Sequence, residues 1–176
     1  MPTTDEQFLL QQNDLLNCLC AALASRPNPP AKCCLTWGDP IADISQNDDD
    51  CCQGTAYVRM LESYPSFNFF PDRTVERQSG PCGVTAWALR LEVTVFRCWP
   101  GGDVNAIPTC AELTAATEQL ISDTNAVREA MCCLRDINRR RRQLVSIADI
   151  SPIAPLGGCA GVQGNITIQI PQCSTC

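Results

Sequence analysis

Histidine is absent from this chain of 176 residues. Its absence excludes serine–histidine and cysteine–histidine nucleophile pairs, two-histidine iron sites, and every zinc site other than all-thiolate or carboxylate ones. The sequence also lacks GxSxG and P-loop motifs, and its glycine-rich stretch, 157–161, precedes a predicted strand where a phosphate-binding loop needs a helix. A carboxylate pair or an activated cysteine remains possible in principle, but no pattern indicates either. We therefore expect that the chain is not an enzyme.

Long apolar runs and an excess of basic charge are also missing. The most apolar stretch, 83–99, is interrupted by Arg90, Glu92 and Arg97, whereas a membrane span needs about 20 apolar residues. Thirteen Lys and Arg residues against nineteen Asp and Glu residues give a net charge of -6, which disfavours general binding to nucleic-acid phosphates. Asp5 and Glu6 stand where a signal peptide needs basic residues. We expect synthesis in the cytoplasm and no membrane association.

The overall composition predicts one globular domain. Hydrophobic residues make up 45% of the chain and charged residues 18%, which is typical of folded proteins and not of disordered ones. The length slightly exceeds the roughly 150 residues of one compact domain. No internal repeat or linker is visible. We assign residues 1–170 to a single α+β domain and residues 171–176 to a C-terminal tail.

Hydrophobic periodicity predicts two helices. Apolar residues recur at helical spacing from 5 to about 25, and the prolines at 27–30 end this segment. A second helix of about 25 residues begins at Thr109, whose spacing to Glu112 is that of a capping box.

Alternation of side chains predicts the strands. From Thr85 onward one face carries large apolar residues and the other small, polar or charged ones, which is the clearest strand pattern in the chain. Further strands are predicted at 33–37, 55–61, 144–150 and around Ile166, Ile168 and Ile170, with a Pro/Gly-rich connection at 152–164. This order predicts an α+β fold in which both helices pack on one face of a mainly antiparallel or mixed sheet of four or five strands.

Three polar groups are candidates for contacts between protein copies or for the lining of a lumen. One is the polar face of the strand that begins near Thr85, which should meet water, a neighbouring subunit or a lumen. The second is an acidic run typical of a solvated loop, and the third is an arginine run suited to a helix C-terminus, to a salt-bridged contact or to a docking patch. The candidate residues are Arg90, Glu92, Thr94, Asp48, Asp49, Asp50, Arg139, Arg140, Arg141 and Arg142.

The fourteen cysteines leave three interpretations open. They are mainly free buried thiols, or they form several disulfides after release from the cell, or four of them bind zinc. Only Cys173 and Cys176 have the CxxC spacing that structural zinc sites usually use. Adjacent cysteines rarely bridge each other, so any disulfides should join different segments. We expect no metal and no other cofactor.

Three stretches occur together in a familiar order. They are CCQGTAYVR at 51–59 ahead of Tyr64-Pro65-Ser66, then Pro81-Cys82 leading into the strand from Trp87 to Cys98, and PLGGCAG at 155–161 before the last strand. In this order they resemble the tail terminator proteins of long-tailed phages that infect actinobacteria. The resemblance spans about Cys33 to Ile170.

The resemblance implies a virion structural protein at the head–tail junction, with an α/β sandwich fold in which helices pack on a mixed sheet. Six copies would form a ring that caps the tail tube, stops polymerisation of the major tail protein and docks the stopper protein of the head–tail connector. DNA would pass through the lumen without sequence-specific binding, which the net acidity of the chain suits.

Two other functions are compatible with the sequence. One is a different ring protein of the same connector, a stopper or an adaptor. The other is a cytosolic cysteine-rich module that binds zinc or an iron–sulfur cluster, and stoichiometric metal would distinguish it from the ring proteins.

Overall fold

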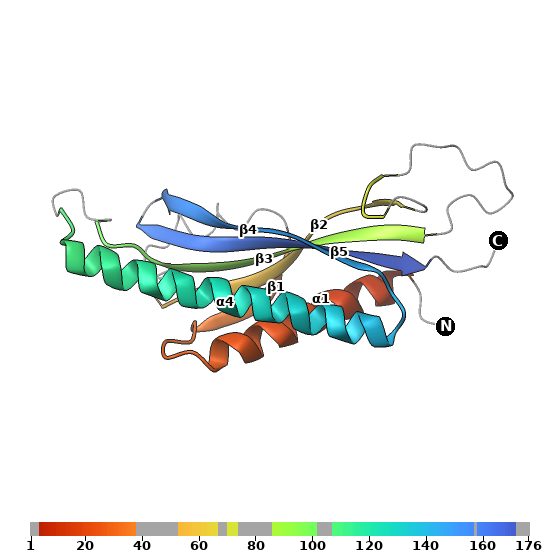
Figure 1. Ribbon diagram of the computed structural model, residues 1–176, viewed down its shortest axis with the longest axis horizontal. Helices are drawn as coiled ribbons and strands as arrows, with labels where there is room; N and C mark the ends of the chain where they lie inside the picture. Colours follow the sequence, from red (N-terminus) through yellow and green to blue (C-terminus); the bar gives the residue numbers. More distant parts are fainter. Residues whose placement is uncertain are drawn as a thin grey trace, which may run out of the picture.

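The computed structural model describes residues 4–37, 53–66, 70–73, 86–101, 107–156 and 158–171. Within these residues two helices and five strands follow one another as helix, three strands, helix and two strands, in agreement with the predicted order of helix, two or three strands, helix and two strands. Figure 1 shows both helices against one side of the sheet, which confirms the predicted α+β class. The elements are α1 Thr4–Ala24, β1 Lys32–Thr36, β2 Thr55–Pro65, β3 Ala86–Cys98, α4 Cys110–Arg140, β4 Val145–Leu156 and β5 Cys159–Pro171.

The sheet is mixed, with strand order β1-β2-β3-β5-β4. β1 runs parallel to β2, and the other neighbouring pairs are antiparallel. β3 lies in the centre and pairs along its whole length with β5. β1 and β4 are the two edges, and over the described ranges no strand pairs with the outer side of either.

The core lies between the sheet and the helices. The predicted alternation of β3 is confirmed, because Leu89, Leu91 and Val93 are fully buried in the same cluster as Leu15 of α1 and Met131 of α4. Burying one such side chain contributes roughly 1.5–3 kcal/mol. The core is therefore built from one face of the sheet and the facing stripes of both helices.

A glycine in β5 lets α4 approach the sheet closely. A Cβ atom at Gly164 would lie 2.4 Å from Cε of Met131 and 3.1 Å from Cγ1 of Val127. A larger residue there would require at least the Met131 side chain to move. The alternating isoleucines of the predicted last strand, 166, 168 and 170, follow this glycine and are all buried.

The capping box that begins α4 is present as predicted. The Thr109 hydroxyl accepts a hydrogen bond from the amide of Glu112, whose carboxylate accepts from the Thr109 amide at 2.8 Å. This backbone hydrogen bond, together with one from the Thr109 hydroxyl, lowers the pKa of Glu112. α4 then continues for 31 residues, longer than the sequence predicted.

One connection was predicted wrongly. The segment from Pro152 onward, expected as a Pro/Gly-rich connection, continues β4 to Leu156, and β5 begins three residues later at Cys159. Proline has no N–H to donate and is therefore tolerated on edge strands. β4 is such an edge, with Pro152 paired opposite Val162 of β5.

Disulfides bear on the three interpretations of the cysteines within the described residues. Cys18 of α1 is bonded to Cys133 of α4, and Cys20 of α1 is bonded to Cys33 of β1. Cys98 and Cys159 are disulfide-bonded as well. For the described cysteines, the interpretation that they are mainly free thiols is therefore wrong. Only Cys34, Cys110 and Cys132 are free in that part of the chain.

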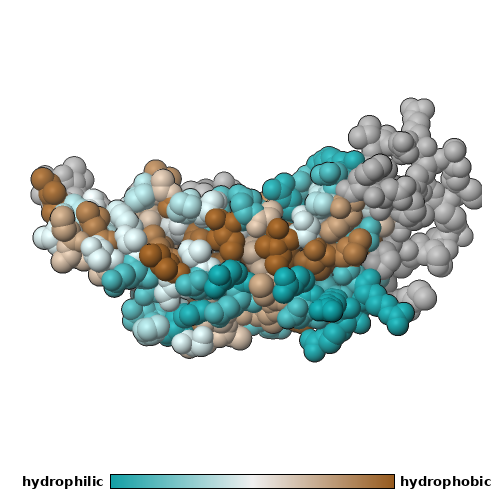
Figure 2. Space-filling view, in the orientation of Figure 1, coloured by the Kyte–Doolittle hydropathy of each residue, from teal (hydrophilic) through white to brown (hydrophobic). Residues whose placement is uncertain are grey.

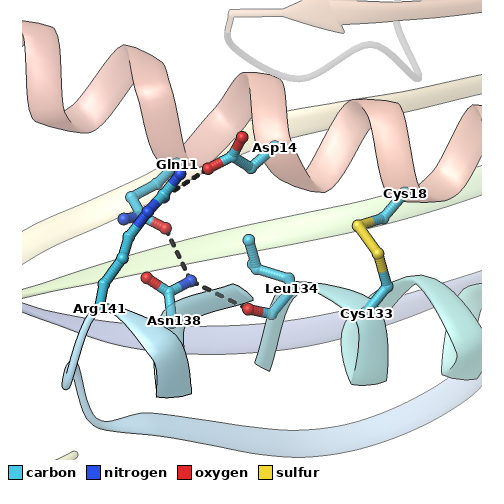
Figure 3. The surroundings of a disulfide bond; sticks show 7 residues. All are labelled: Gln11, Asp14, Cys18, Cys133, Leu134, Asn138 and Arg141. Carbon is cyan, nitrogen blue, oxygen red and sulfur yellow. Dashed lines mark hydrogen bonds and ion pairs between the residues drawn. A yellow bond between two sulfur atoms is a disulfide. The ribbon is translucent and has the colours of Figure 1, made fainter. Parts of the chain in front are cut away.

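The Cys18–Cys133 bridge (Figure 3) should stabilise the fold strongly, because it closes a sequence separation of 115 residues. Replacing both cysteines by alanine is expected to lower the free energy of unfolding by about 4–5 kcal/mol, the entropic value for a loop of roughly 100 residues. Urea unfolding without reductant measures the change. Cys34→Ala, which removes an exposed free thiol, is the matched control and should change little. Equal effects of the two changes would contradict the assigned bridge.

Candidate functional site

The sheet face opposite the helices carries the predicted residues Glu92 and Thr94. Nε of Arg59, across the strand pair on β2, donates to Oε1 of Glu92 at 2.7 Å. The Thr94 hydroxyl donates to the same oxygen at 3.2 Å. Only 7% of Glu92 and 1% of Thr94 are exposed.

Glu92 and Thr94 therefore do not lie on the surface of the single subunit, although the sequence predicted that this face meets water, a neighbour or a lumen. The guanidinium of Arg59 lowers the energetic cost of burying Glu92. It compensates the carboxylate, so that the charge can be withdrawn from water. The sequence of one strand does not show which residue its neighbour places opposite.

Arg90, the third predicted residue of this face, keeps much of its surface. Its side chain is 40% exposed and lies 3.4 Å from Oε1 of Glu62 on β2. Arg73 is ion-paired to the same carboxylate, and its guanidinium lies over the Tyr64 ring at 4.9 Å from the centroid. Two cations thus share the carboxylate of Glu62.

Tyr64 lies beside the group of charged residues around Glu62. Its hydroxyl donates to the carbonyl of Pro71 at 2.7 Å. Burial raises the pKa of Tyr64, and the negative charge of Glu62 raises it further. The ring therefore stays neutral and holds the segment with Pro71 and Arg73 against β2.

A buried ion pair joins β3 to α4 on the helix side of the sheet. Nε and Nη2 of Arg97 donate to the two carboxylate oxygens of Asp123 at 2.7 and 2.9 Å. Their side chains are 10% and 0% exposed. Gln119 donates to Asp123, and Asn28, after α1, donates to Gln119. The chain of contacts fixes the position of α4 against both β3 and the segment that follows α1.

This ion pair was not predicted from the sequence. A signal was available, because Arg97 has the same parity along the strand as Leu89 and Leu91 and so points toward the helices. A charged residue on the apolar face of a strand requires a buried partner. The pattern thus indicated that a carboxylate would lie on one of the helices, but not which one.

The arginine run at the end of α4 has divided roles. Arg141 is the C-cap of α4 and pairs with Asp14 of α1 at 2.5 Å (Figure 3). Arg142 adopts a positive φ of 59° and turns the chain toward β4. Arg139 and Arg140 are both exposed. Capping and an acidic partner, both among the expected roles, thus occur within the subunit.

Beside this cap, amide side chains connect the helices. Nδ2 of Asn138 donates to Gln11 at 2.9 Å, and Gln11 in turn donates to Gln143 at 3.0 Å. Together with the Cys18–Cys133 bridge, these contacts align the start of α1 with the end of α4, as Figure 3 shows.

Asp48, Asp49 and Asp50 lie outside the described residues. The same holds for the Pro81-Cys82 stretch of the resemblance and for residues 51 and 52.

Exposed apolar side chains gather along the two edges of the sheet. We name the set on or next to α4 and β4 the α4–β4 stripe, and Figure 2 shows apolar residues in a band along these elements. We name the set on α1 and at the end of β1 the α1–β1 flank. The stripe comprises Ile107, Ile121, Leu144 and Leu156, and the flank comprises Leu9, Leu10 and Trp37. Their exposure reaches 96% at Ile107 and 79% at Trp37.

Comparison with known proteins identifies no family for this chain. No protein-family model matches the chain, and no curated protein matches it in sequence. Within the described ranges, no group of three or more Cys, Asp or Glu residues is arranged to hold a metal ion. No helix there is both long and apolar enough to cross a membrane.

Asp123→Ala is expected to cost about 3–5 kcal/mol of stability, because it leaves the Arg97 guanidinium buried without its anion. Replacing both residues by apolar ones, Arg97→Met with Asp123→Leu, should recover most of the loss. Denaturant unfolding measures both changes. Asp136→Ala breaks the exposed pair with Arg135 and is the control, with an expected loss of at most about 1 kcal/mol. A loss at Asp123 no larger than that at Asp136 would contradict the structural role of the pair.

Proposed function

We propose that the chain is a tail terminator, the subunit of a six-copy ring that caps the tail tube of a long-tailed phage. The observation that carries the proposal is the sheet with two different open edges. β1 and β4 differ in length and sequence, and each lies beside exposed apolar side chains. Exposed apolar side chains gathered on one surface are typical of protein–protein contacts.

Two different edges favour a ring over a symmetric pair. A contact between β4 of one copy and β1 of the next is heterologous, since the two surfaces differ. It leaves a free β1 and a free β4 at the ends of every open assembly, and it closes when the rotation per copy divides a full turn.

The stretches that resemble tail terminators come together in the fold. Thr55 of the first stretch pairs with Phe96 of the second, and Phe96 pairs with Gly161 of the third. Tyr57, Phe96 and Cys159 form a small buried cluster on the outer face. Described parts of three separate stretches thus meet at one end of the sheet, whereas Tyr64 pairs with Ala88 toward the other end.

Close steric contacts explain why glycine stands at two positions of these stretches. Gly54 has a φ of +79°, and a Cβ atom there would lie 2.4 Å from Arg97. At Gly161 a Cβ atom would lie 2.4 Å from the carbonyl oxygen of Val95. Side chains at these positions would push the strands apart, so this packing requires glycine there.

The partners follow from the proposal. They are further copies of the chain, the major tail protein below the ring and the stopper protein above it, in the virion at the head–tail junction. The acidic net charge suits a lumen through which DNA slides. The proposal assigns the chain no catalytic step and no cofactor.

A stopper or adaptor has the same geometric support and remains the second candidate. The metal-binding module is less favoured, because Cys18, Cys20, Cys33 and Cys133 are joined in disulfides and cannot act as thiolate ligands.

Binding to tail tubes distinguishes terminator from stopper. Added to tubes assembled from the major tail protein, the chain is expected to form one ring at the tube end and to stop elongation, as seen by electron microscopy. Complete tails, whose ends are already capped, are the control and should not bind it. Binding to complete tails but not to bare tubes would assign the stopper role, and binding to neither would overturn both.

A further inference from the structure

Strand direction determines how two open edges can pair. β1 runs parallel to β2, and each step from β2 through β3 and β5 to β4 reverses direction. β4 therefore runs opposite to β1. In a ring whose axis lies along the strands, every copy keeps the same strand direction, so β4 of one copy meets β1 of the next in antiparallel orientation. This is the more stable type of pairing.

The helices would then lie side by side across the contact. α1 covers the β1 side of the sheet and α4 the β4 side, both on the same face. Continuing the sheet from β4 into the next β1 places the neighbour's α1 beside the outer flank of α4. That flank carries Ile121, which lies about 120° around the helix from Cys133, the residue bonded to α1.

The outward surface of α1 is suited to such a contact. From Gln7 to Ala24 its only charged residue is Asp14, and that carboxylate is paired with Arg141 of the same chain. Leu9 is 53% exposed and precedes Cys20 by about three turns, so it lies on the flank that Cys20 joins to β1. A helix that faces water usually carries charged residues, as α4 does with Arg128 and Arg135, which follow Ile121 at seven-residue steps on the same flank.

The helix ends are complementary in charge. The contacts of Gln11 with Asn138 place the start of α1 level with the end of α4 within one subunit. A ring axis along the strands keeps these ends level between copies too. The positive end of the neighbour's α1 dipole, which carries Glu6, then lies beside the negative end of α4, which carries Arg139 and Arg140. Both the dipoles and the side chains attract.

We infer that the contact between neighbouring copies in the ring joins the α4–β4 stripe of one copy to the α1–β1 flank of the next, with β4 antiparallel to the neighbour's β1. This inference rests on the proposed ring. The partner that covers the stripe is thus a second copy of this chain. The contact buries apolar side chains from both sides and pairs the strand edges that the single subunit leaves open.

Two double variants test the two surfaces separately. One, Ile121→Glu with Leu144→Glu, introduces charge into the stripe, and the other, Leu9→Glu with Trp37→Glu, introduces it into the flank. All four side chains are exposed, so folding should be retained, and thermal unfolding checks this. Leu61→Glu, at an exposed apolar residue of β2 outside both surfaces, is the matched control.

Native mass spectrometry of the full chain measures the number of copies in each assembly. The wild-type chain and the control should form rings, whereas each double variant alone should be monomeric at ten times the concentration at which the wild type is closed. An equal mixture of the two variants should give dimers with one copy of each, because one intact stripe and one intact flank remain. Rings from either variant, or a mixture that stays monomeric, would overturn the inferred contact.

The same data separate this inference from the proposed function. Wild-type rings together with variants that still close would reject the contact and leave the ring in place. A wild-type chain that stays monomeric in solution and on tail tubes would reject the ring itself.

Discussion

The burial of one face of the sheet by α1 and α4 is the interaction on which the rest of the structure depends. Leu89, Leu91 and Val93 of β3 have no water-free environment unless both helices lie on the same side. That requirement sets the layer arrangement. Because the helices cover a face and not the edges, β1 and β4 have no paired strand on their outer sides among the described residues, and this relates the fold to the proposed assembly.

Covalent and ionic contacts then fix how the helices sit. The Cys18–Cys133 bridge, the buried pair of Arg97 and Asp123, and the capping contact of Arg141 with Asp14 all connect α4 to other elements. Of these contacts, the Arg97–Asp123 pair is buried. A rigid subunit with apolar edges is suited to building a ring, since little conformational entropy remains to be lost when copies associate.

Local patterns predicted the parts of the fold that depend on local physics. The alternation of β3 and the capping box of Thr109 and Glu112 are confirmed because side-chain periodicity and capping act over a few residues. Contacts between residues far apart in the sequence could not be predicted. The sequence showed neither that Arg59 lies opposite Glu92 nor that Cys18 meets Cys133, and it did not show that β4 is an edge where Pro152 is tolerated.

A native mass spectrum of the wild-type chain, purified without reductant or chelator, tests the central claim most directly. The account predicts a closed ring of six 19.2 kDa subunits without metal, each lighter than the reduced chain by two hydrogens for every disulfide. A monomer that carries stoichiometric zinc or iron, with its cysteines unpaired, would contradict it.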